Sequence, residues 1–372
     1  MTTVFILFVL LIMPYRFIIR RANRQLMFLK KYMPKGVSTA KVSIIIAARN
    51  EEMNIRNCLE SLLAQDFPRE QVEIIVVDDQ SVDGTVAVVR TYANRGIRLI
   101  ILDKDEAFGK KAAIARGIAI ATHDTIITTD ADCSFPPRWL NTMLSFKEDM
   151  DAVFVAAPVQ FRTEKTMLDR FQSLDFLALQ GITAAAVSNR QLNMCNGANL
   201  LYTKEAFLEV NGFEGIDHIA SGDDMLLMEK IDKAFPGKVA YCFSEAAIVV
   251  TDPAASWDAF IQQRIRWSSK AKNYTSLPIK ATLLLVYLVN AAMVSLLLAG
   301  IYDWRMLKFF LLFTAMKTIV ELPFMIRIAR FFGKSPLIYW FIPFQPIHAI
   351  YTVVAGTFGL FAKYSWKGRE VS

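Results

Sequence analysis

Cysteine is scarce in this chain, and its spacing excludes two classes of protein. Among 372 residues there are only four cysteines, and no two of them form a Cys-x-x-Cys pair. Such spacing argues against a disulfide framework and against a zinc site. We therefore expect reduced, buried thiols in a cytosolic domain at Cys58, Cys133, Cys195 and Cys242. Internal repeats and low-complexity tracts are also missing.

A large excess of one charge is missing as well. The net charge is only +7, while 54% of the residues are hydrophobic. Much of the basic excess lies beside apolar segments, which favours a membrane surface as partner and argues against nucleic acid. These basic residues near the N-terminus are Arg16, Arg20, Arg21, Arg24, Lys30 and Lys31. The length suits one large soluble domain plus several membrane spans.

The first apolar stretch, residues 2–19, has no Lys or Arg before it. A cleaved signal peptide needs positive charge ahead of its apolar core, so residues 1–24 are predicted to be a membrane anchor. The arginines that follow place the N-terminus outside and the chain from residue 30 onward in the cytoplasm. We therefore expect a multi-pass protein of the cell membrane with a cytoplasmic catalytic domain.

Residues 40–253 alternate between apolar runs and helical segments. Continuous Ile and Val runs predict buried strands at 42–48, 72–77, 97–102 and 125–129, and helices are expected between them, the first capped by Asn50. This pattern predicts an α/β domain with a mostly parallel sheet covered on both faces. Ligands of such sheets bind at the carboxyl ends of the strands.

Acidic residues follow two of the predicted strands. Asp78 and Asp79 come after the second strand, and Asp130 and Asp132 form an Asp-x-Asp pair after the fourth. A carboxylate at 78–79 can accept hydrogen bonds from a ribose hydroxyl or a base N–H, although an acidic turn explains one such pair equally well. Asp130 and Asp132 are predicted to hold a divalent cation on the diphosphate of a nucleotide sugar.

Three further segments carry candidate chemistry, each with a plainer alternative. Lys110 and Lys111 open a predicted helix, where they meet phosphate or simply solvent. Asn196 and Gly197 begin a turn that leads into a short apolar strand, and on their own they are typical of an ordinary Asn-Gly turn. Asp223 and Asp224 begin another helix: one carboxylate is expected to cap it, and Asp224 is predicted to be the general base.

Residues 254–273 are predicted to form an amphipathic helix at the membrane surface. Trp257, Ile261 and Ile265 recur every four residues. Within it, Arg266 is a candidate ligand of diphosphate and Trp267 a platform for a sugar ring, with Gln263 beside them. Membrane anchoring by Arg and Trp is the alternative.

The remaining sequence, 281–361, is predicted to be a transmembrane region. Residues 281–300 carry no charge, and 306–326 form a second span in which Lys317 and Glu321 can pair on one helix face. That pair is structural, or it serves an acceptor passage. Residues 337–361 either span once, which leaves Lys363, Lys367 and Arg369 outside, or form a re-entrant or interfacial segment.

In this order and spacing, the motifs resemble the family-2 glycosyltransferases over about residues 40–270. The similarity is to the integral-membrane branch with cellulose, chitin and hyaluronan synthases and ceramide glucosyltransferases. It implies a GT-A nucleotide-sugar-binding fold with transmembrane helices at both ends, an inverting reaction, and Mn²⁺ or Mg²⁺ as cofactor. It further implies that Asp78, Asp79, Lys110, Asp130 and Arg266 bind the donor, often a UDP-sugar. Acceptor-binding residues would be Asn196, Gly197, Gln263 and Trp267, and Asp223 and Asp224 would be catalytic.

The sequence departs from the family at two places. Asp223 stands where many members have Glu, and 196–199 replaces a longer aromatic-Cys-Gly loop of the cellulose synthases. Together with the few C-terminal spans, this leaves a single sugar transfer to a lipid or glycan acceptor open beside processive polymer export. A non-catalytic membrane scaffold with a degenerate transferase domain, and a transporter, are the alternative functions.

Overall fold

The computed structural model describes residues 2–103, 108–190, 194–217, 222, 224–269, 276–361, 364–366 and 369–371. The chain forms two compact units. The sheet unit consists of residues 29–162 and 186–252, and the helical unit of 1–28, 163–185 and 253–372. The long helix α6 (Met167–Ser188) begins in the helical unit and ends in the sheet unit.

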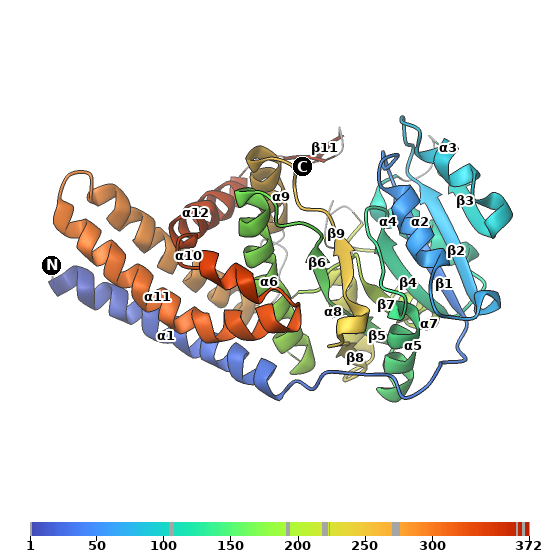
Figure 1. The fold of residues 1–372 in the computed structure, drawn as a ribbon, viewed down its shortest axis with the longest axis horizontal. Coiled ribbons are helices and arrows are strands. Elements are labelled where there is room, and N and C mark those ends of the chain that lie inside the picture. Colours follow the sequence, from blue (N-terminus) through green and yellow to red (C-terminus); the bar gives the residue numbers. More distant parts are fainter. Residues whose placement is uncertain are drawn as a thin grey trace. The chain divides into compact units, whose positions relative to one another are not determined.

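The sheet unit is built on a seven-stranded sheet with the order β3-β2-β1-β4-β7-β5-β8 (Figure 1). Its first four strands are parallel to one another. They are β1 (Val42–Ala48), β2 (Val72–Asp78), β3 (Ile97–Ile101) and β4 (Thr125–Asp130). Their Ile and Val side chains are largely buried, as expected for a sheet covered on both faces. The predicted parallel sheet is thus confirmed.

Helices connect and cover these strands. They are α2 (Ile55–Leu63), α3 (Thr85–Arg90) and α4 (Lys110–Ile120), with 3₁₀ turns η1 (Arg69–Gln71) and η2 (Ala93–Arg95). Helix α4 lies so close to the sheet that a side chain at Gly117 would overlap that of Ile45. Asn50 does not cap α2, contrary to the prediction. Asn50 adopts a left-handed φ of 52° in the preceding loop, and α2 begins only at Ile55.

The remaining strands of the sheet unit are shorter than the first four. Strand β7 (Leu200–Thr203) runs antiparallel to both β4 and β5 (Phe154–Ala156), and β8 (Val239–Tyr241) is parallel to β5. Strands β6 (Val159–Phe161) and β9 (Val249–Thr251) form a separate parallel pair. The accompanying helices are α5 (Trp139–Asp149), α7 (Lys204–Glu209), α8 (Met225–Ala234) and η3 (Glu245–Ala247).

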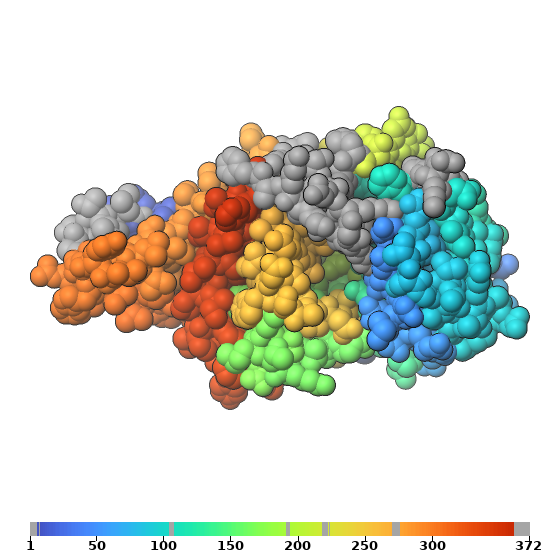
Figure 2. Space-filling model, turned by 90° about the horizontal axis from the view of Figure 1, so that it is seen from above, coloured from blue at the N-terminus to red at the C-terminus, as the bar shows by residue number. Residues whose placement is uncertain are grey.

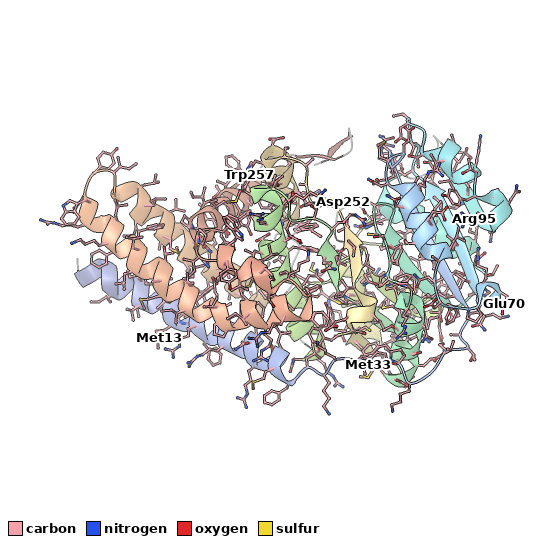
Figure 3. The ribbon with its side chains drawn as sticks, viewed as in Figure 1. Met13, Met33, Glu70, Arg95, Asp252 and Trp257 are labelled. Atoms are coloured by element: carbon pink, nitrogen blue, oxygen red, sulfur yellow. The ribbon has the colours of Figure 1, made fainter. Side chains whose placement is uncertain are left out.

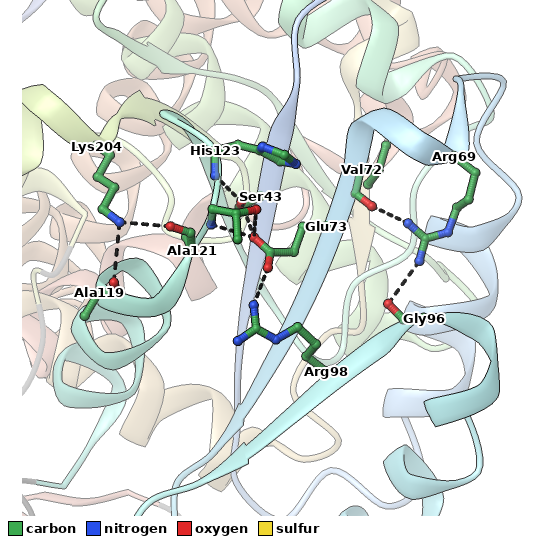
Figure 4. Close-up of polar contacts among 11 residues, drawn as sticks. Ser43, Arg69, Val72, Glu73, Gly96, Arg98, Ala119, Ala121, His123 and Lys204 are labelled. Carbon is green, nitrogen blue, oxygen red and sulfur yellow. Dashed lines mark hydrogen bonds and ion pairs between the residues drawn. The ribbon is translucent and has the colours of Figure 1, made fainter.

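The amino edge of the parallel strands is fastened by polar contacts (Figure 4). Glu73 of β2 accepts hydrogen bonds from the Ser43 hydroxyl at 2.6 Å and from the Thr122 backbone N–H at 2.9 Å, and it pairs with Arg98. Lys204 donates to the Ala121 carbonyl oxygen at 2.9 Å, just after helix α4 ends. Backbone and side-chain groups at this edge therefore join neighbouring strands and helix ends.

The helical unit contains five longer helices and one short hairpin among its described residues. Helices α1 (Thr2–Phe28), α9 (Trp257–Ser269), α10 (Leu277–Ala299), α11 (Trp304–Phe331) and α12 (Gln345–Phe361) join α6 there, with η5 (Ser335–Trp340) before α12. The hairpin pairs β10 (Tyr364–Trp366) with β11 (Arg369–Val371).

By length and composition, two helices of the described chain can cross a membrane, namely α10 and α11. Both lie toward the C-terminus, whereas the sequence predicted transmembrane helices at both ends. The predicted apolar segment 337–361 is not one helix, because a turn separates η5 from the 17-residue α12. A helix of that length is shorter than the roughly 20 residues needed for a span.

Apolar side chains are exposed on three helices of this unit. On α1, Leu10, Met13 and Phe17 follow one another along one side, and Met13 is 55% exposed (Figure 3). The surface of α10 and α11, orange in Figure 2, carries further exposed apolar residues. They include Leu284, Leu288, Leu298, Leu311, Leu312 and Ile319. Water solvates such surfaces poorly, so this unit presents an apolar exterior.

The opposite side of α11 carries a buried polar cluster. Lys317 and Glu321 form the predicted ion pair at 2.8 Å, one helical turn apart. Gln345 of α12 bridges the two, accepting from Lys317 at 2.7 Å and donating to Glu321 at 2.8 Å. The Tyr15 hydroxyl of α1 donates to Glu321. Through these contacts the ion pair joins α11 to α1 and α12, which is a structural role.

Candidate active site

Asp78, the last residue of β2, is the least satisfied carboxylate at the carboxyl edge of the sheet. Its side chain is 1% exposed. Oδ2 accepts the Ser81 backbone N–H at 3.0 Å, whereas Oδ1 has no hydrogen-bond partner among the described residues. Leaving a buried acceptor unpaired costs about 1–3 kcal/mol. The unsatisfied oxygen is therefore the strongest sign of a ligand position in this unit.

Asp79 has a different environment from Asp78, although the two are neighbours. Its Oδ1 accepts the backbone N–H of Gly109 at 2.9 Å, directly before helix α4. Gly109 has a φ of 97°, which side-chain-bearing residues rarely adopt. Asp79 thus fixes the start of the helix that carries Lys110. It supports the candidate donor-binding residue Lys110 through the backbone.

The loop after β2 is tied to the loop after β1 by a set of reciprocal hydrogen bonds. Asn50 donates its N–H to the Ser81 hydroxyl and accepts the Val82 N–H on its side-chain oxygen, both at 2.9 Å. The Arg49 guanidinium donates to the Asp79 carbonyl oxygen at 2.6 Å. These contacts explain the left-handed conformation of Asn50, and they hold Asp78 in a fixed position.

The Asp-x-Asp pair follows β4, as predicted. Asp130 forms an ion pair with Lys110 at 2.7 Å, and Asp132 accepts a hydrogen bond from the Thr251 hydroxyl at 3.1 Å. Lys110 comes from α4 and Thr251 from β9, so three elements converge on these carboxylates. Ser134 continues the connection by pairing with Val250 of β9. The structure thus brings together Lys110 and Asp130, two of the predicted donor-binding residues.

Two cysteines lie beside the Asp-x-Asp pair. Cys133 donates its thiol to Asp132 at 3.6 Å, and Cys58 donates to the Asp130 carbonyl oxygen at 3.8 Å. Burial, together with the negative charge of Asp132 and Asp130, raises the pKa of both thiols well above the usual value. They stay protonated and are poor metal ligands. The four cysteines are free thiols and three are buried as predicted, but Cys195 is only half-buried.

A divalent cation fits the chemistry of this edge. Among the described residues there is no cluster of three or more His, Cys, Asp or Glu side chains able to hold a metal ion. Mg²⁺ and similar hard cations need only one or two carboxylates when substrate phosphates and water complete the coordination. Asp130 and Asp132 supply such oxygens. The Lys110 ammonium, which pairs with Asp130, shows that the position favours positive charge.

The Asn196–Asn199 segment forms a turn, and its hydrogen bonds connect neighbouring elements. Asn196 accepts the Ala198 N–H on its side-chain oxygen at 2.9 Å, which makes it the turn that the plainer interpretation expected, and Gly197 is buried within it. Asn199 is fully buried and links three elements, because it accepts from Trp139 and donates to the carbonyl oxygens of Pro158 and Ala247. Acceptor binding by Asn196 and Gly197 stays a prediction.

Asp224 caps helix α8. Its Oδ1 accepts the Met225 N–H at 2.7 Å, and the side chain is buried. The expectation that Asp224 is free of capping duty is therefore wrong, since the helix begins directly after it. Its role as general base stays a prediction, because one carboxylate oxygen suffices for the cap. Asp223 lies outside the described residues.

Gln263, Arg266 and Trp267 lie on α9 in the helical unit. All three are half-buried, whereas the neighbouring Arg264 and Phe260 are buried. Of the predicted apolar stripe, Ile265 is buried, Ile261 is half-buried and Trp257 is 44% exposed (Figure 3). The sequence motif does not single out Arg264. Its burial depends on Asp175 of α6, with which it pairs at 2.7 Å and which no local pattern reveals.

Comparison with known proteins gives consistent matches. Residues 43–210 match the profile of glycosyl transferase family 2. Glycosyltransferase AglE from Haloferax volcanii is 30% identical over 186 residues, which are 50% of this chain and 59% of that protein. The probable glycosyltransferase YdaM from Bacillus subtilis is 26% identical over 275 residues, 69% of this chain and 62% of that protein. The chain thus spans less than two thirds of either relative.

Among solved structures, a mannosyltransferase from Pyrobaculum calidifontis in complex with GDP-Man and Mn²⁺ has the same fold. The TM-score is 0.62 at 20% identity, and the alignment covers 97% of each chain. The predicted GT-A fold class is thereby confirmed. The matched segment 43–210 contains Asp78, Lys110 and the Asp-x-Asp pair. The similarity to glycosyl transferase family 2 thus includes the sheet edge that carries these residues.

Proposed function

We propose that this protein is a membrane-bound, inverting glycosyltransferase that moves a sugar from a nucleotide-sugar donor to a lipid or glycan acceptor. The observation that supports it most is the buried, unsatisfied Asp78 Oδ1 on the same sheet edge as the Lys110–Asp130 pair. An acceptor atom without a partner suits a donor N–H or hydroxyl of a nucleoside. The neighbouring ion pair suits a diphosphate and its cation.

The roles of the residues follow from their contacts. Asp78 would accept a hydrogen bond from the nucleoside, and the loops at 49–52 and 78–83 keep it in place before the donor arrives. Lys110 would leave Asp130 in part to contact diphosphate oxygens. Asp130 and Asp132 would hold Mn²⁺ or Mg²⁺, which, when bound, neutralises the charge on the leaving diphosphate.

An inverting transfer needs a base on the acceptor side. We assign this role to Asp224, which would take the proton of the acceptor hydroxyl as that oxygen attacks the anomeric carbon. The capping bond from Met225 fixes the orientation of the carboxylate. A carboxylate has about four lone-pair sites, so accepting the capping N–H does not exhaust its capacity to accept a proton. Capping and proton transfer are therefore compatible in one side chain.

Membrane attachment is supported by the helical unit. Helices α10 and α11 have the length and hydropathy of membrane spans, and exposed apolar residues cover α1, α10 and α11. Arginines follow the apolar part of α1, and by the positive-inside rule they support our proposal that the sheet unit is cytoplasmic. Nucleotide sugars are available there. We infer that the acceptor is a membrane lipid, or a glycan presented at the membrane.

The test is sugar release from a panel of nucleotide sugars by the full chain purified in detergent with Mn²⁺. Each donor is offered with water alone, with polyprenyl phosphate, with ceramide and with short glycan oligomers, and products are identified by mass. Transfer from one donor supports the proposal, and the Asp132→Ala variant serves as the matched inactive control. A wild-type protein that consumes no donor in any combination contradicts it and favours the scaffold or transporter alternative.

A further inference from the structure

The most completely buried ion pair of the described chain lies next to the Gln-x-x-Arg-Trp segment, outside the donor site. Oδ2 of Asp175 on α6 accepts a hydrogen bond from Nε of Arg264 on α9 at 2.9 Å, and the two side chains form an ion pair with Nη2 at 2.7 Å from Oδ2. The two side chains are only 3% and 4% exposed. The hydroxyl of Tyr351 on α12 donates to the other oxygen of Asp175. One carboxylate thus receives donors from two helices.

Arg264 in turn contacts a polar and an aromatic side chain of the motif on its own helix. Its Nη1 donates to Gln263 Oε1 at 2.6 Å. Its guanidinium lies 4.2 Å from the centre of the Trp267 ring and 4.5 Å from that of Phe260. Cations stacked on aromatic faces gain most when they are removed from water. Gln263 and Trp267 are therefore held by one guanidinium.

Helix α6 also holds the start of α9. The side-chain amide of Gln172 donates to the Ala254 carbonyl oxygen and accepts the Ala254 N–H, both at 2.9 Å. Further along α6, Phe176 lies 6.2 Å from the Trp267 ring centre. The same face of α6 thus fixes the entry to α9, its middle and the motif tryptophan. Because one face of α6 makes all these contacts, they fix the rotational orientation of α9 about its own axis.

A buried ion pair is weak evidence for stability, because the cost of desolvation offsets the attraction. What the pair supplies here is orientation, since a planar guanidinium can be bound at its edge and stacked on its faces at the same time. We propose that Arg264 is a positioning residue that fixes Gln263 and Trp267 for acceptor recognition, and that Asp175 and Tyr351 fix Arg264. This inference rests on the proposed function and on the sequence-based prediction that Gln263 and Trp267 bind the acceptor.

The first experiment reads the position of Trp267 without any substrate. The full chain is labelled with 5-fluorotryptophan in detergent, and the Trp267 resonance is assigned by its loss in Trp267→Phe. Arg264→Lys keeps the charge but loses the planar stacking surface, so the resonance should shift or broaden. Tyr351→Phe, which removes a single hydroxyl, should give a smaller change in the same direction. An unmoved resonance in Arg264→Lys overturns the inference.

The second experiment separates donor and acceptor steps with the donor and acceptor found in the panel above. Arg264→Lys and Asp175→Asn should raise the acceptor KM about 10-fold, while donor hydrolysis stays within about twofold. The double variant should be no worse than the more severe single one, because the residues act as one unit. An unchanged acceptor KM in the folded single variants contradicts the positioning role.

Lys334→Gln is the matched control. Lys334 pairs with Glu164, which accepts from Ser173 of α6, so this variant breaks a partly buried ion pair of the same unit that does not contact α9. It should leave the Trp267 resonance and the acceptor KM unchanged. An equal shift in this control would show general loosening and overturn the inference. If the resonance shifts in the Arg264 and Tyr351 variants but not in the control, while wild type consumes no donor, the positioning stands and the proposed function fails.

Discussion

Strand β2 carries a carboxylate near each end, and the two differ in how completely they are hydrogen-bonded. Glu73, at the amino edge, accepts hydrogen bonds from Ser43 and Thr122 and pairs with Arg98. Asp78, at the carboxyl edge, is buried with one oxygen unpaired among the described residues. Both ends belong to one rigid strand, so backbone geometry does not explain the contrast. The hydrogen-bonded Glu73 joins neighbouring strands, whereas the unpaired oxygen of Asp78 is the position we propose for a ligand.

The same contrast extends to the neighbouring strands. At the amino edge, Lys204 binds carbonyl oxygens at the end of α4. At the carboxyl edge, Lys110 begins α4 and pairs with Asp130, which is 37% exposed. A partly exposed ion pair contributes little to stability, about 0–1 kcal/mol. Substitutions at the carboxyl edge should therefore lower activity at little cost in stability, and substitutions at the amino edge should do the reverse.

The largest effect on activity is expected for Asp132→Ala. Loss of a cation ligand at the leaving group should reduce sugar transfer by about 10³-fold, in line with the loss of strong electrostatic stabilisation. The midpoint of thermal unfolding should stay nearly unchanged. Thr251→Val removes only the hydrogen bond to Asp132 and should cost a few-fold. Exhaustive EDTA treatment should abolish transfer and Mn²⁺ should restore it, and full activity in EDTA would refute the cation role.

A somewhat smaller loss is expected for Asp224→Asn. Asparagine keeps the helix cap, because its side-chain oxygen can still accept the Met225 N–H. It cannot accept a proton, so turnover should fall by about 10²-fold. Donor affinity, measured by titration calorimetry, should match wild type. Near-normal turnover would remove Asp224 from the role of base and leave it as a cap.

Asp78→Asn tests the unsatisfied oxygen directly. The asparagine oxygen can take over the Ser81 N–H, which leaves an NH₂ group where Oδ1 now lies. That group cannot accept a hydrogen bond from a nucleoside, so the donor KM should rise about 10-fold, equivalent to about 1.4 kcal/mol. Stability should be equal or slightly higher, since a buried charge is removed. A variant with an unchanged donor KM would show that Asp78 is purely structural.

Glu73→Gln should have the smallest effect on activity, within about twofold, and should lower stability by about 2 kcal/mol through lost charge-assisted hydrogen bonds. Burial tends to raise the pKa of Glu73, but the bonds from Ser43, Thr122 and Arg98 outweigh it and lower the pKa below the usual value. Its contribution is therefore present above the unfolded pKa and is lost as the pH falls through the folded pKa. Denaturant titrations should show the wild-type advantage at pH 7 and its loss in acid.

The strands β1 to β4 and the acidic residues after them could be predicted because local signals suffice. A run of Ile and Val between turn residues reads as a buried strand, and parallel strands bring Asp78 and Asp130 to one edge. The rest depended on distant partners. Asn50 looks like a helix cap by residue type, yet its left-handed conformation is set by Ser81 and Val82 on another loop.

The arginines of α9 show the same limit. Arg264 and Arg266 are two residues apart and point to different sides of the helix, and both are chemically able to bind phosphate. Which one turns inward is decided by Asp175, 89 residues earlier in the chain. A sequence pattern places both arginines on a helix. The pattern does not reveal which side of the helix packs against a carboxylate from another element.

Under the membrane attachment proposed above, the Lys317–Glu321 pair has a consequence for the order in which the helices insert. Each charged residue near the middle of an isolated inserting helix costs about 3 kcal/mol. In the folded protein Gln345 and Tyr15 share these charges, but α12 is synthesised after α11, whereas α1 is already complete. During biogenesis, α1 is therefore the only one of the two neighbours available to α11 as it leaves the ribosome. Helix α1 would then act as an intramolecular chaperone for the insertion of α11.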